Sequence, residues 1–353
     1  MPDGNNSGTY SSRPAFNVGG QDNADLGAGL LSLHIVESIA GLYRCEAVFG
    51  NWGAQGFRYF DRRILDFGKA LQVKFGNELL FDGRITALEA RFPEGAPSQI
   101  NVLAEDRLQD LRMTRRTRSF ADVGDADVFS QIASDHGLQA QVNLQGPTYK
   151  VLAQVNQSDL AFLRDRARAL GAEVWVEGTA LHAARRPDRM TGQPVELALN
   201  ARLREFSVIA DLAGQRTGVT IGGWDVSGKA AQTSEATQSA ISNELESGES
   251  GASILSSSFG ARKEAIVHGM PLSSDDAQAQ AEGAFRLLAR RFVVGRGRAQ
   301  TDARLRVGTA VDLKGLGPLF SGKYYLSEVC HLFDSAKGIR TEFTGERPWL
   351  GRP

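Results

Sequence analysis

Stretches of alternating apolar and polar residues, separated by turn dipeptides, fill the first third of the chain and return near its end. LLSLHIVES, LYRCEAVFG, ALQVKFGNELLFDGRITALEARF and SQINVLAED follow this pattern between residues 13 and 110, with Gly76-Asn77 and Asp82-Gly83 as turn signals. A period of two places successive side chains on opposite faces of a strand. This region is therefore predicted to form a small antiparallel barrel or sandwich.

Segments in the middle of the chain change to helical spacing. DADVFSQIASDHG and SDLAFLRDRARALG carry apolar residues three and four positions apart, and the second has Ser158 as an N-cap and Gly171 as a stop signal. AEVWVEGTALHAARR indicates a hairpin that turns at Glu177-Gly178. A further helix over SSDDAQAQAEGAFRLLARRF is expected to be capped near Ser274.

The chain has 353 residues, of which 42% are hydrophobic, so it can bury a sizeable core and divide into two or more domains. We expect a mainly β fold with α+β insertions, built around two similar antiparallel β-barrels. The predicted segments are a first barrel over 13–111, an α/β insertion over 112–199, a second barrel from 200–228 and 296–346, an insertion over 229–295 with a helix and a flexible Ser/Gln/Glu-rich loop at 229–258, and a tail over 347–353.

An internal repeat is the reason for expecting two similar barrels. Residues 73–92 (VKFGNELLFDGRITALEARF) align with residues 311–333 (VDLKGLGPLFSGKYYLSEVCHLF) when 80–84 (LFDGR) is placed opposite 319–323 (LFSGK). Each copy is interpreted as a strand, a turn that closes on Leu-Phe-x-Gly-basic, and a second strand.

A cluster of polar residues near the C-terminus suggests a catalytic site at first sight, because Ser327, Glu328, Cys330, His331 and Asp334 lie within eight residues. KYYLSEVCHLF alternates like a strand, however, so Cys330 and His331 point to opposite faces. Ser327 and His331 share a face but are about 13 Å apart along a strand. A nucleophile and its base must lie within about 3 Å, so a half-buried strand is the preferred interpretation.

No catalytic, metal or cofactor site is predicted from the rest of the sequence. Gly295 and Gly297 lack the third glycine and the following helix of a dinucleotide site, and are interpreted as a turn or bulge. Cys45 and Cys330 are far apart in sequence and suit a reducing compartment. The five histidines have no metal-ligand spacing; they are His34, His136, His182, His268 and His331.

The charge balance gives no reason to expect a nucleic-acid or membrane partner, since 40 basic residues face 41 acidic ones. The start of the chain lacks the features of a signal peptide, and no apolar run is long enough to span a membrane. We therefore expect the protein to be made and kept in the cytoplasm, unless it leaves by lysis or inside a larger particle. The basic run RMTRRTR has no interleaved aromatic residues and is interpreted as a solvated or inter-subunit face; its arginines are Arg112, Arg115, Arg116 and Arg118.

The order of these segments resembles the late control D family, the tail hub proteins of contractile phages and related injection systems. It is similar to the hub half of type VI secretion spike proteins. The resemblance is carried by SDLAFLRDRARALGAEVWVEGTALHAARR, by VTIGGWDVSGKA and, most specifically, by RRFVVGRGRAQTDARLRVGTAVDLKGLGPLFSGKYYLSEVCHLFDSAKGIRTEFTGERP at the end. The Ser/Gln/Glu-rich insertion at 229–258 is a departure from the family pattern, and its role is not supplied by the resemblance.

The resemblance implies a structural part rather than an enzyme. It implies two β-barrels per subunit and a homotrimeric ring, which joins the hexameric tail tube to the trimeric spike in a virion tail or injection-particle baseplate. The partners would be the spike protein, the inner tail tube protein and other baseplate proteins. Fused spike proteins continue beyond the hub segment, so the spike is expected to be a separate polypeptide. Three subunits with two similar barrels each would present six similar faces.

The tail over 347–353 contains a combination favoured at interface anchors, Arg347, Trp349 and Leu350. We expect it to dock against a neighbouring subunit or the spike, although a frayed terminus is an equal alternative. Two other classes of function remain open. A tail-associated cell-wall hydrolase would need converging carboxylates or a nucleophile pair, and a β-barrel nucleic-acid-binding protein would show strongly salt-dependent binding.

Overall fold

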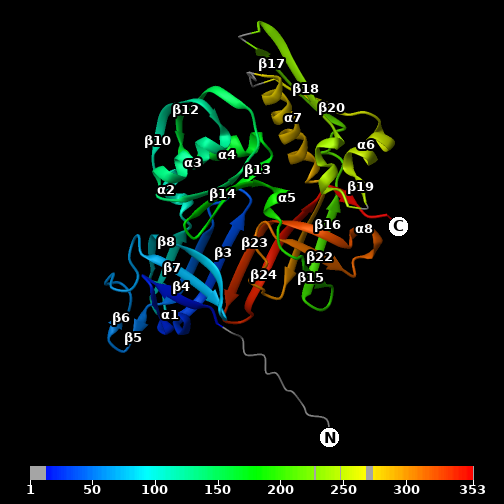
Figure 1. Ribbon diagram of the computed structural model, residues 1–353. Helices are drawn as coiled ribbons and strands as arrows, with labels where there is room; N and C mark the ends of the chain where they lie inside the picture. Colours follow the sequence, from blue (N-terminus) through cyan, green and yellow to red (C-terminus); the bar gives the residue numbers. More distant parts are fainter. Residues whose placement is uncertain (1–12, 226–227, 247, 268–272, 353) are drawn as a thin grey trace.

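The computed structural model describes residues 13–225, 228–246, 248–267 and 273–352, and it is mainly β, as predicted (Figure 1). Within these residues thirteen strands form one large sheet, with the path β16-β21-β24-β23-β3-β4-β9-β8-β7-β1-β2 and with β15 and β22 attached beside β23. Two smaller modules lie over this sheet at the top of the view. The sheet therefore forms the base on which the rest of the chain is placed.

The first half of the sheet comes from the N-terminal region. Its strands alternate in burial, as the sequence pattern requires. The elements are β1 (Ala15–Val18), β2 (Gln21–Asp22), α1 (Ala24–Gly29), β3 (Leu30–Ser38), β4 (Arg44–Gly50), β5 (Trp52–Gly53), β6 (Gly56–Phe57), β7 (Ala70–Phe75), β8 (Glu78–Arg91) and β9 (Gln99–Glu105).

The second half comes mainly from the C-terminal region, and β23 joins it to the first half by pairing with β3. In Figure 1 the orange and red strands therefore lie beside the blue ones, although they are far apart in sequence. The elements are β15 (Val195–Ala198), β16 (Leu203–Ala210), β21 (Val293–Ala299), β22 (Ala310–Lys314), α8 (Gly317–Phe320), β23 (Gly322–Asp334) and β24 (Gly338–Arg347).

The two halves repeat the same unit of five strands. Strands β3-β4-β9-β8-β7 and strands β16-β21-β24-β23-β22 have the same spatial order, the same chain order and antiparallel pairing throughout. The next strand differs, because β1 is antiparallel to β7 whereas β15 is parallel to β22. An internal repeat is therefore present, and it is longer than the one seen in the sequence.

Two β-bulges in each copy fix how the copies align. The register shifts between Leu30 and Ser32 in β3 and between Leu203 and Glu205 in β16. It shifts again at Thr86 in β8 and at Ser327 in β23. Since a bulge adds one residue at a defined place, matching the bulges places Ile85 opposite Leu326 and Leu71 opposite Val311.

The sequence alignment of the repeat was wrong by two residues. It placed Gly83 opposite Gly322, but Gly83 pairs with Leu71, whereas Gly322 pairs with Leu313. The matching Leu-Phe pairs also differ in structure, because residues 80–81 lie in β8 and residues 319–320 lie in α8. The cause is that Gly76-Asn77 closes the first hairpin, whereas the second is closed by a longer turn containing α8.

The expectation of two separate barrels was also not met, since the described strands do not close either half into a barrel. The β3–β23 pairing continues the sheet from one half into the other. A single hydrophobic core follows this junction and contains residues of both halves, among them Ile35, Val102, Leu326, Val329 and Phe343.

The first insertion, between β9 and β15, forms the module at the upper left of Figure 1 and has its own hydrophobic core. The predicted N-cap is confirmed, because the Ser158 hydroxyl accepts a hydrogen bond from the amide of Ala161. The predicted hairpin at residues 172–185 is confirmed as well. The elements are α2 (Leu108–Arg112), β10 (Arg115–Gly124), α3 (Asp125–Asp135), β11 (Gln139–Asn143), β12 (Thr148–Ser158), α4 (Asp159–Ala169), β13 (Ala172–Glu177), β14 (Ala180–Arg185) and α5 (Arg186–Arg189).

The second insertion, between β16 and β21, corrects the expectation of a loop over residues 229–258. The described residues of this segment contain two strands, a 3-10 helix and an α-helix, because Ala236, Ile241 and Ala252 pack against α7 in a small core. Short side chains bury little area each, so a Ser- and Ala-rich composition did not indicate that this segment packs into a core. The elements are β17 (Gly218–Asp225), β18 (Ala230–Ala236), η1 (Gln238–Glu244), β19 (Glu249–Ser250), α6 (Gly251–Phe259), β20 (Lys263–Ile266) and α7 (Ser274–Ala289), and β19 pairs with the C-terminal β25 (Trp349–Leu350).

Gly295 and Gly297 lie inside β21 and not in a turn, so that interpretation was wrong. A Cβ atom at Gly295 would lie 2.0 Å from the ring of Phe206, and one at Gly297 would lie 2.5 Å from the ring of Phe343. These glycines therefore leave space for two aromatic rings that pack directly onto the strand backbone.

Candidate functional site

The Ser327–His331 segment is a strand, as predicted, and the two side chains bond different partners. The Ser327 hydroxyl donates a hydrogen bond to the backbone oxygen of Thr344 at 3.3 Å, at the bulge of β23. His331 is buried and its Nδ1 lies 2.9 Å from the hydroxyl of Thr341. Burial, together with the charge of Arg306, lowers the pKa of His331 to about 3, so the ring is neutral at pH 7.

Neither cysteines nor histidines form a metal centre in the described part of the chain, where no group of three potential ligands is found. Cys45 and Cys330 are both free thiols. The described helices also include none with the length and apolar character needed to cross a membrane.

The basic run at residues 112–118 is engaged in ion pairs within the chain. Arg112 bonds Glu105 at 2.5 Å, and Arg118 bonds both Asp135 and Asp159 at 2.8 Å. These contacts hold β10 against α3 and α4, so much of this positive charge is neutralised locally.

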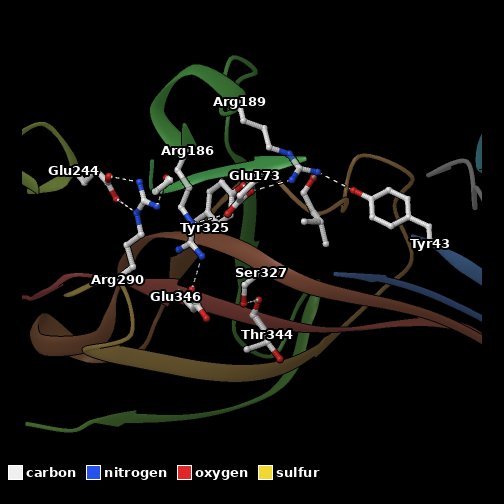
Figure 2. Close-up of polar contacts among 12 residues, drawn as sticks. Tyr43, Glu173, Arg186, Arg189, Glu244, Arg290, Tyr325, Ser327, Thr344 and Glu346 are labelled. Carbon is white, nitrogen blue, oxygen red and sulfur yellow. Dashed lines mark hydrogen bonds and ion pairs between the residues drawn. The ribbon is translucent and has the colours of Figure 1, made fainter. Parts of the chain in front are cut away.

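A buried network of polar side chains lies where the first insertion meets the large sheet (Figure 2). Glu173 of β13 is at its centre and accepts hydrogen bonds from Arg186 at 2.8 Å, from Arg189 at 2.9 Å and from the Tyr325 hydroxyl. Arg186 also bonds Glu346 of β24 at 2.7 Å. The network therefore joins β13 and α5 of the insertion to β23 and β24 of the sheet.

Aromatic rings complete the surroundings of the two arginines. The Arg186 guanidinium lies 4.4 Å from the ring centre of Tyr325, and that of Arg189 lies 4.0 Å from the ring centre of Trp175. Arg189 further donates to the Tyr43 hydroxyl at 2.7 Å. Stacking and paired hydrogen bonds suit arginine in a desolvated position.

The charges of the network are balanced, and its groups remain in their ordinary ionised or neutral forms. Burial acts to raise the pKa of Glu173, but Arg186 and Arg189 more than offset it and hold that pKa below its usual value. Burial and the adjacent Glu173 raise the pKa of Tyr325 far above its usual value. Glu173 is thus a carboxylate and Tyr325 a neutral donor at pH 7. The network ties β13 and α5 of the insertion to β23 and β24 of the sheet through paired, buried charges.

The three C-terminal residues predicted as an interface are brought together by the structure, against their own chain. Arg347 is buried, donates to the backbone oxygens of Leu319 and Ser321, and stacks on Trp349. Trp349 is buried and pairs with β19, whereas Leu350 is half-buried. Leu350 is therefore the most exposed of the three, and it packs partly against the main core.

Among the described residues, β15 pairs with β22 only, and two longer edges of the large sheet also lack a second backbone partner. β16 pairs along its length with β21 only, apart from a single bridge between Leu203 and Leu199. β8 extends beyond the end of its pairing with β7. Its residues after Ile85 therefore pair with β9 on one side and have no backbone partner on the other. Unpaired edges present rows of free amide and carbonyl groups, and they are common sites of strand addition from another chain. Neither of these two edges was predicted from the sequence. The signal for them was the repeat, in which FGKALQVK (67–74) matches VGTAVDLK (307–314).

The fold is similar to solved structures of phage tail proteins, as the sequence resemblance predicted. The 43 kDa tail protein of prophage MuSo2 from Shewanella oneidensis superposes with a TM-score of 0.71 at 13% identity, over 95% of this chain and 98% of that one. The tail protein from Neisseria meningitidis MC58 gives a TM-score of 0.67 at 12% identity, over 96% and 97% of the two chains.

A third similar structure comes from a secretion system. The Escherichia coli c3393 protein, described as a type VI secretion component with structural similarity to T4 bacteriophage tail proteins gp27 and gp5, gives a TM-score of 0.57 at 11% identity, over 92% of this chain and 76% of that one. A search among curated proteins found no match. The model of the Alg8 N-terminal domain family matches residues 31–334, which is most of the sequence. The chain therefore belongs to the Alg8 N-terminal domain family and has the fold of phage tail proteins.

Proposed function

We propose that this protein is the structural hub of a contractile tail or injection-system baseplate, a homotrimeric adapter that joins the hexameric tail tube to the trimeric spike. The single observation that carries the proposal is the repetition of one five-strand unit within one sheet. Three such chains present six similar units, which a six-fold tube can contact on one side while a three-fold spike contacts the other. The similarity of the fold to tail proteins supports the same role.

The proposed role is structural rather than catalytic, and needs no cofactor. The polar groups that attract attention in the sequence are used in packing: Ser327 at the bulge bonds the backbone oxygen of Thr344, His331 bonds Thr341, and Glu173 is held by two arginines. In such a protein the free energy of function lies in its interfaces. The partners are a second and third copy, the spike, the inner tube protein and other baseplate proteins, in a virion tail or injection particle.

The proposal is tested by purifying the full chain alone and together with co-expressed tube and spike proteins. The chain alone should have the mass of a trimer in native mass spectrometry and appear as a ring with six similar lobes in negative stain. Tube and spike proteins should each co-purify with it. A monomer at micromolar concentration, or a trimer that binds neither partner, would contradict the hub function.

Leu350 gives a narrower test of the docking proposed for the tail. Because its side chain is half-buried and the neighbouring Trp349 is buried, Leu350→Asp should weaken binding of the spike or a neighbouring subunit while the fold is kept. Arg352→Ala, at an exposed position two residues further, is the matched control. Unchanged co-purification and unchanged trimer mass for Leu350→Asp would remove the docking proposal.

A further inference from the structure

The junction between the two halves of the sheet provides a template for contacts between chains. At this junction β3 pairs with the C-terminal part of β23, from Ser38 opposite Glu328 to Ser32 opposite Asp334. In the repeat, β16 is the counterpart of β3 and β8 is the counterpart of β23. These two strands carry the open edges described above.

We infer that β16 of one chain pairs antiparallel with the open edge of β8 in a second copy, in the register of the internal β3–β23 junction. The inference rests on the proposed function, because it specifies how the ring closes. Within one chain six strands separate β16 from β8 in the sheet, so they cannot pair with each other. Each chain offers one edge of each kind, and a head-to-tail contact of this type closes into a ring when its rotation allows.

The bulges set the register of the proposed contact. They make Thr86 the counterpart of Ser327, so Arg91 corresponds to Leu332, and they make Ser207 the counterpart of His34. Since Leu332 pairs with His34 at the internal junction, Arg91 is expected to lie opposite Ser207 of the second copy. The same reasoning places Glu89 opposite Ile209.

Residues at the open edge of β8 are more exposed than their counterparts at the internal junction, as expected for a strand that lacks its partner. At the internal junction Phe333 is 4% exposed, whereas its counterpart Phe92 is 67% exposed. Val329 and His331 are fully buried, whereas their counterparts Leu88 and Ala90 are half-buried and exposed. An exposed row of apolar side chains on an open strand edge favours strand addition.

At the end of the contact, a loss of side-chain volume on one side is offset by a gain on the other side. At the internal junction Glu37 receives a hydrogen bond from the amide of Val307 at 3.0 Å, and both residues are buried. The counterpart of Glu37 is Ala210, which has a shorter side chain. The counterpart of Val307 is Phe67, which has a larger one. Phe67 is 55% exposed in the single chain. The pair therefore conserves total volume, as packing across a contact requires.

A surface pocket lies beside Ala210, where the Phe67 ring of the second copy would enter. Its volume is about 790 Å³, and its lining combines the apolar side chains of Leu212, Leu255 and Phe259 with the charged ones of Asp211, Arg216, Arg262 and Lys263. Phe259 is itself exposed in the single chain. A large ring at one open edge and a pocket with apolar side chains beside the other make the second copy the occupant that fits both.

Disulfide cross-linking tests the register. In the full chain with Cys330→Ala, we expect Arg91→Cys combined with Ser207→Cys to form disulfides between chains under mild oxidation, because directly opposite residues have Cα atoms about 4.5–5.5 Å apart. A non-reducing gel should show dimers and trimers and no larger species. Glu89→Cys with Glu205→Cys is the matched control; both positions are exposed, but they lie about 13 Å apart in this register. We expect it to cross-link at least tenfold less.

A second test measures the mass of single variants in the chain that keeps Cys45 and Cys330. Ala210→Arg should fill the entrance of the pocket and convert the assembly to monomers, whereas Val155→Arg, at an exposed apolar position of the first insertion, should leave its mass unchanged. Circular dichroism and the unfolding midpoint would confirm that both variants are folded. If Ala210→Arg fails to fold, Phe67→Ala serves in its place, since that ring is exposed in the single chain.

The outcomes separate the inference from the proposed function. A trimer in which the 91–207 pair does not cross-link, or in which the control pair cross-links equally, overturns this junction and leaves the ring intact. A chain that is monomeric by mass and does not cross-link overturns both. Cross-linked trimers that fail to bind tube and spike uphold the junction and contradict the hub function.

Discussion

Thr86 and Ser327 occupy the same position in the two copies of the repeated unit. Each lies at the bulge of a long strand, and each hydroxyl donates to a backbone oxygen of the adjacent strand at 3.3 Å, Thr86 to Leu103 and Ser327 to Thr344. The serine that stands out in the sequence as a nucleophile candidate is therefore one of a pair of bulge residues. A bulge bends a strand and increases its twist.

We predict that Ser327→Ala and Thr86→Val each lower the free energy of unfolding by about 0.5–1.5 kcal/mol, the usual net contribution of one hydrogen bond. The effects should add in the double variant, because the sites lie in different halves of the sheet and share no hydrogen-bond partner. Urea unfolding at fixed protein concentration measures this. The mass of the native assembly should be the same as that of the unchanged chain. A peptidoglycan-cleaving activity lost with Ser327→Ala would contradict the structural role.

Glu173→Gln should lower the free energy of unfolding by about 3–5 kcal/mol, because it leaves the buried Arg189 without a carboxylate and Arg186 with Glu346 alone. Asp165→Asn, in an exposed ion pair with Arg168 on α4, is the matched control and should change it little. The urea midpoint distinguishes the two variants. Equal and small effects would show that the network does not hold the insertion onto the sheet.

Gly295→Ala should destabilise the sheet by about 1–3 kcal/mol, the range for overpacking, because the new methyl group would meet the Phe206 ring at 2.0 Å. Phe206→Leu in the same chain should recover part of that loss by freeing the space. Gly214→Ala is the control, since no heavy atom lies within 4 Å of a Cβ atom there. Thermal unfolding provides the comparison, and an unaffected Gly295→Ala variant would show that the ring moves without cost.

Acid should destabilise the protein partly through His331. Its pKa is about 6.5 in an unfolded chain and is lowered to about 3 by burial and by Arg306. The contribution of this residue to stability is therefore complete above pH 6.5 and is lost as the pH falls toward 3. At 1.36 kcal/mol per pKa unit, the loss reaches up to about 5 kcal/mol.

The matched variant for this effect is His331→Gln, which keeps a polar side chain near Thr341 but has no titrating group. Its unfolding free energy should be less dependent on pH than that of the unchanged chain between pH 6.5 and 3. His34→Gln, on the exposed side of β3, should keep the original pH dependence. Parallel curves for the unchanged chain and His331→Gln would contradict the assignment.

The sequence by itself determined the local elements. Alternation defined the strands of both halves, Ser158 defined the start of α4, and Gly171 defined its end in a left-handed conformation. The geometry of one strand was also enough to separate Ser327 from His331. These features depend on neighbours within a few positions, so periodicity and capping reveal them without knowledge of the fold.

Only the tertiary structure decided how the strands join. Whether two repeated units form separate barrels or one sheet depends on the β3–β23 pairing, which connects residues almost 300 positions apart in sequence. The register of the repeat depends on bulges, which leave no reliable mark in a sequence. Long-range contacts also decided that Gly295 lies under a ring and that Arg347 and Trp349 pack on their own chain. Strand partners and packing neighbours are set by the free energy of the whole core, and local patterns carry little information about them.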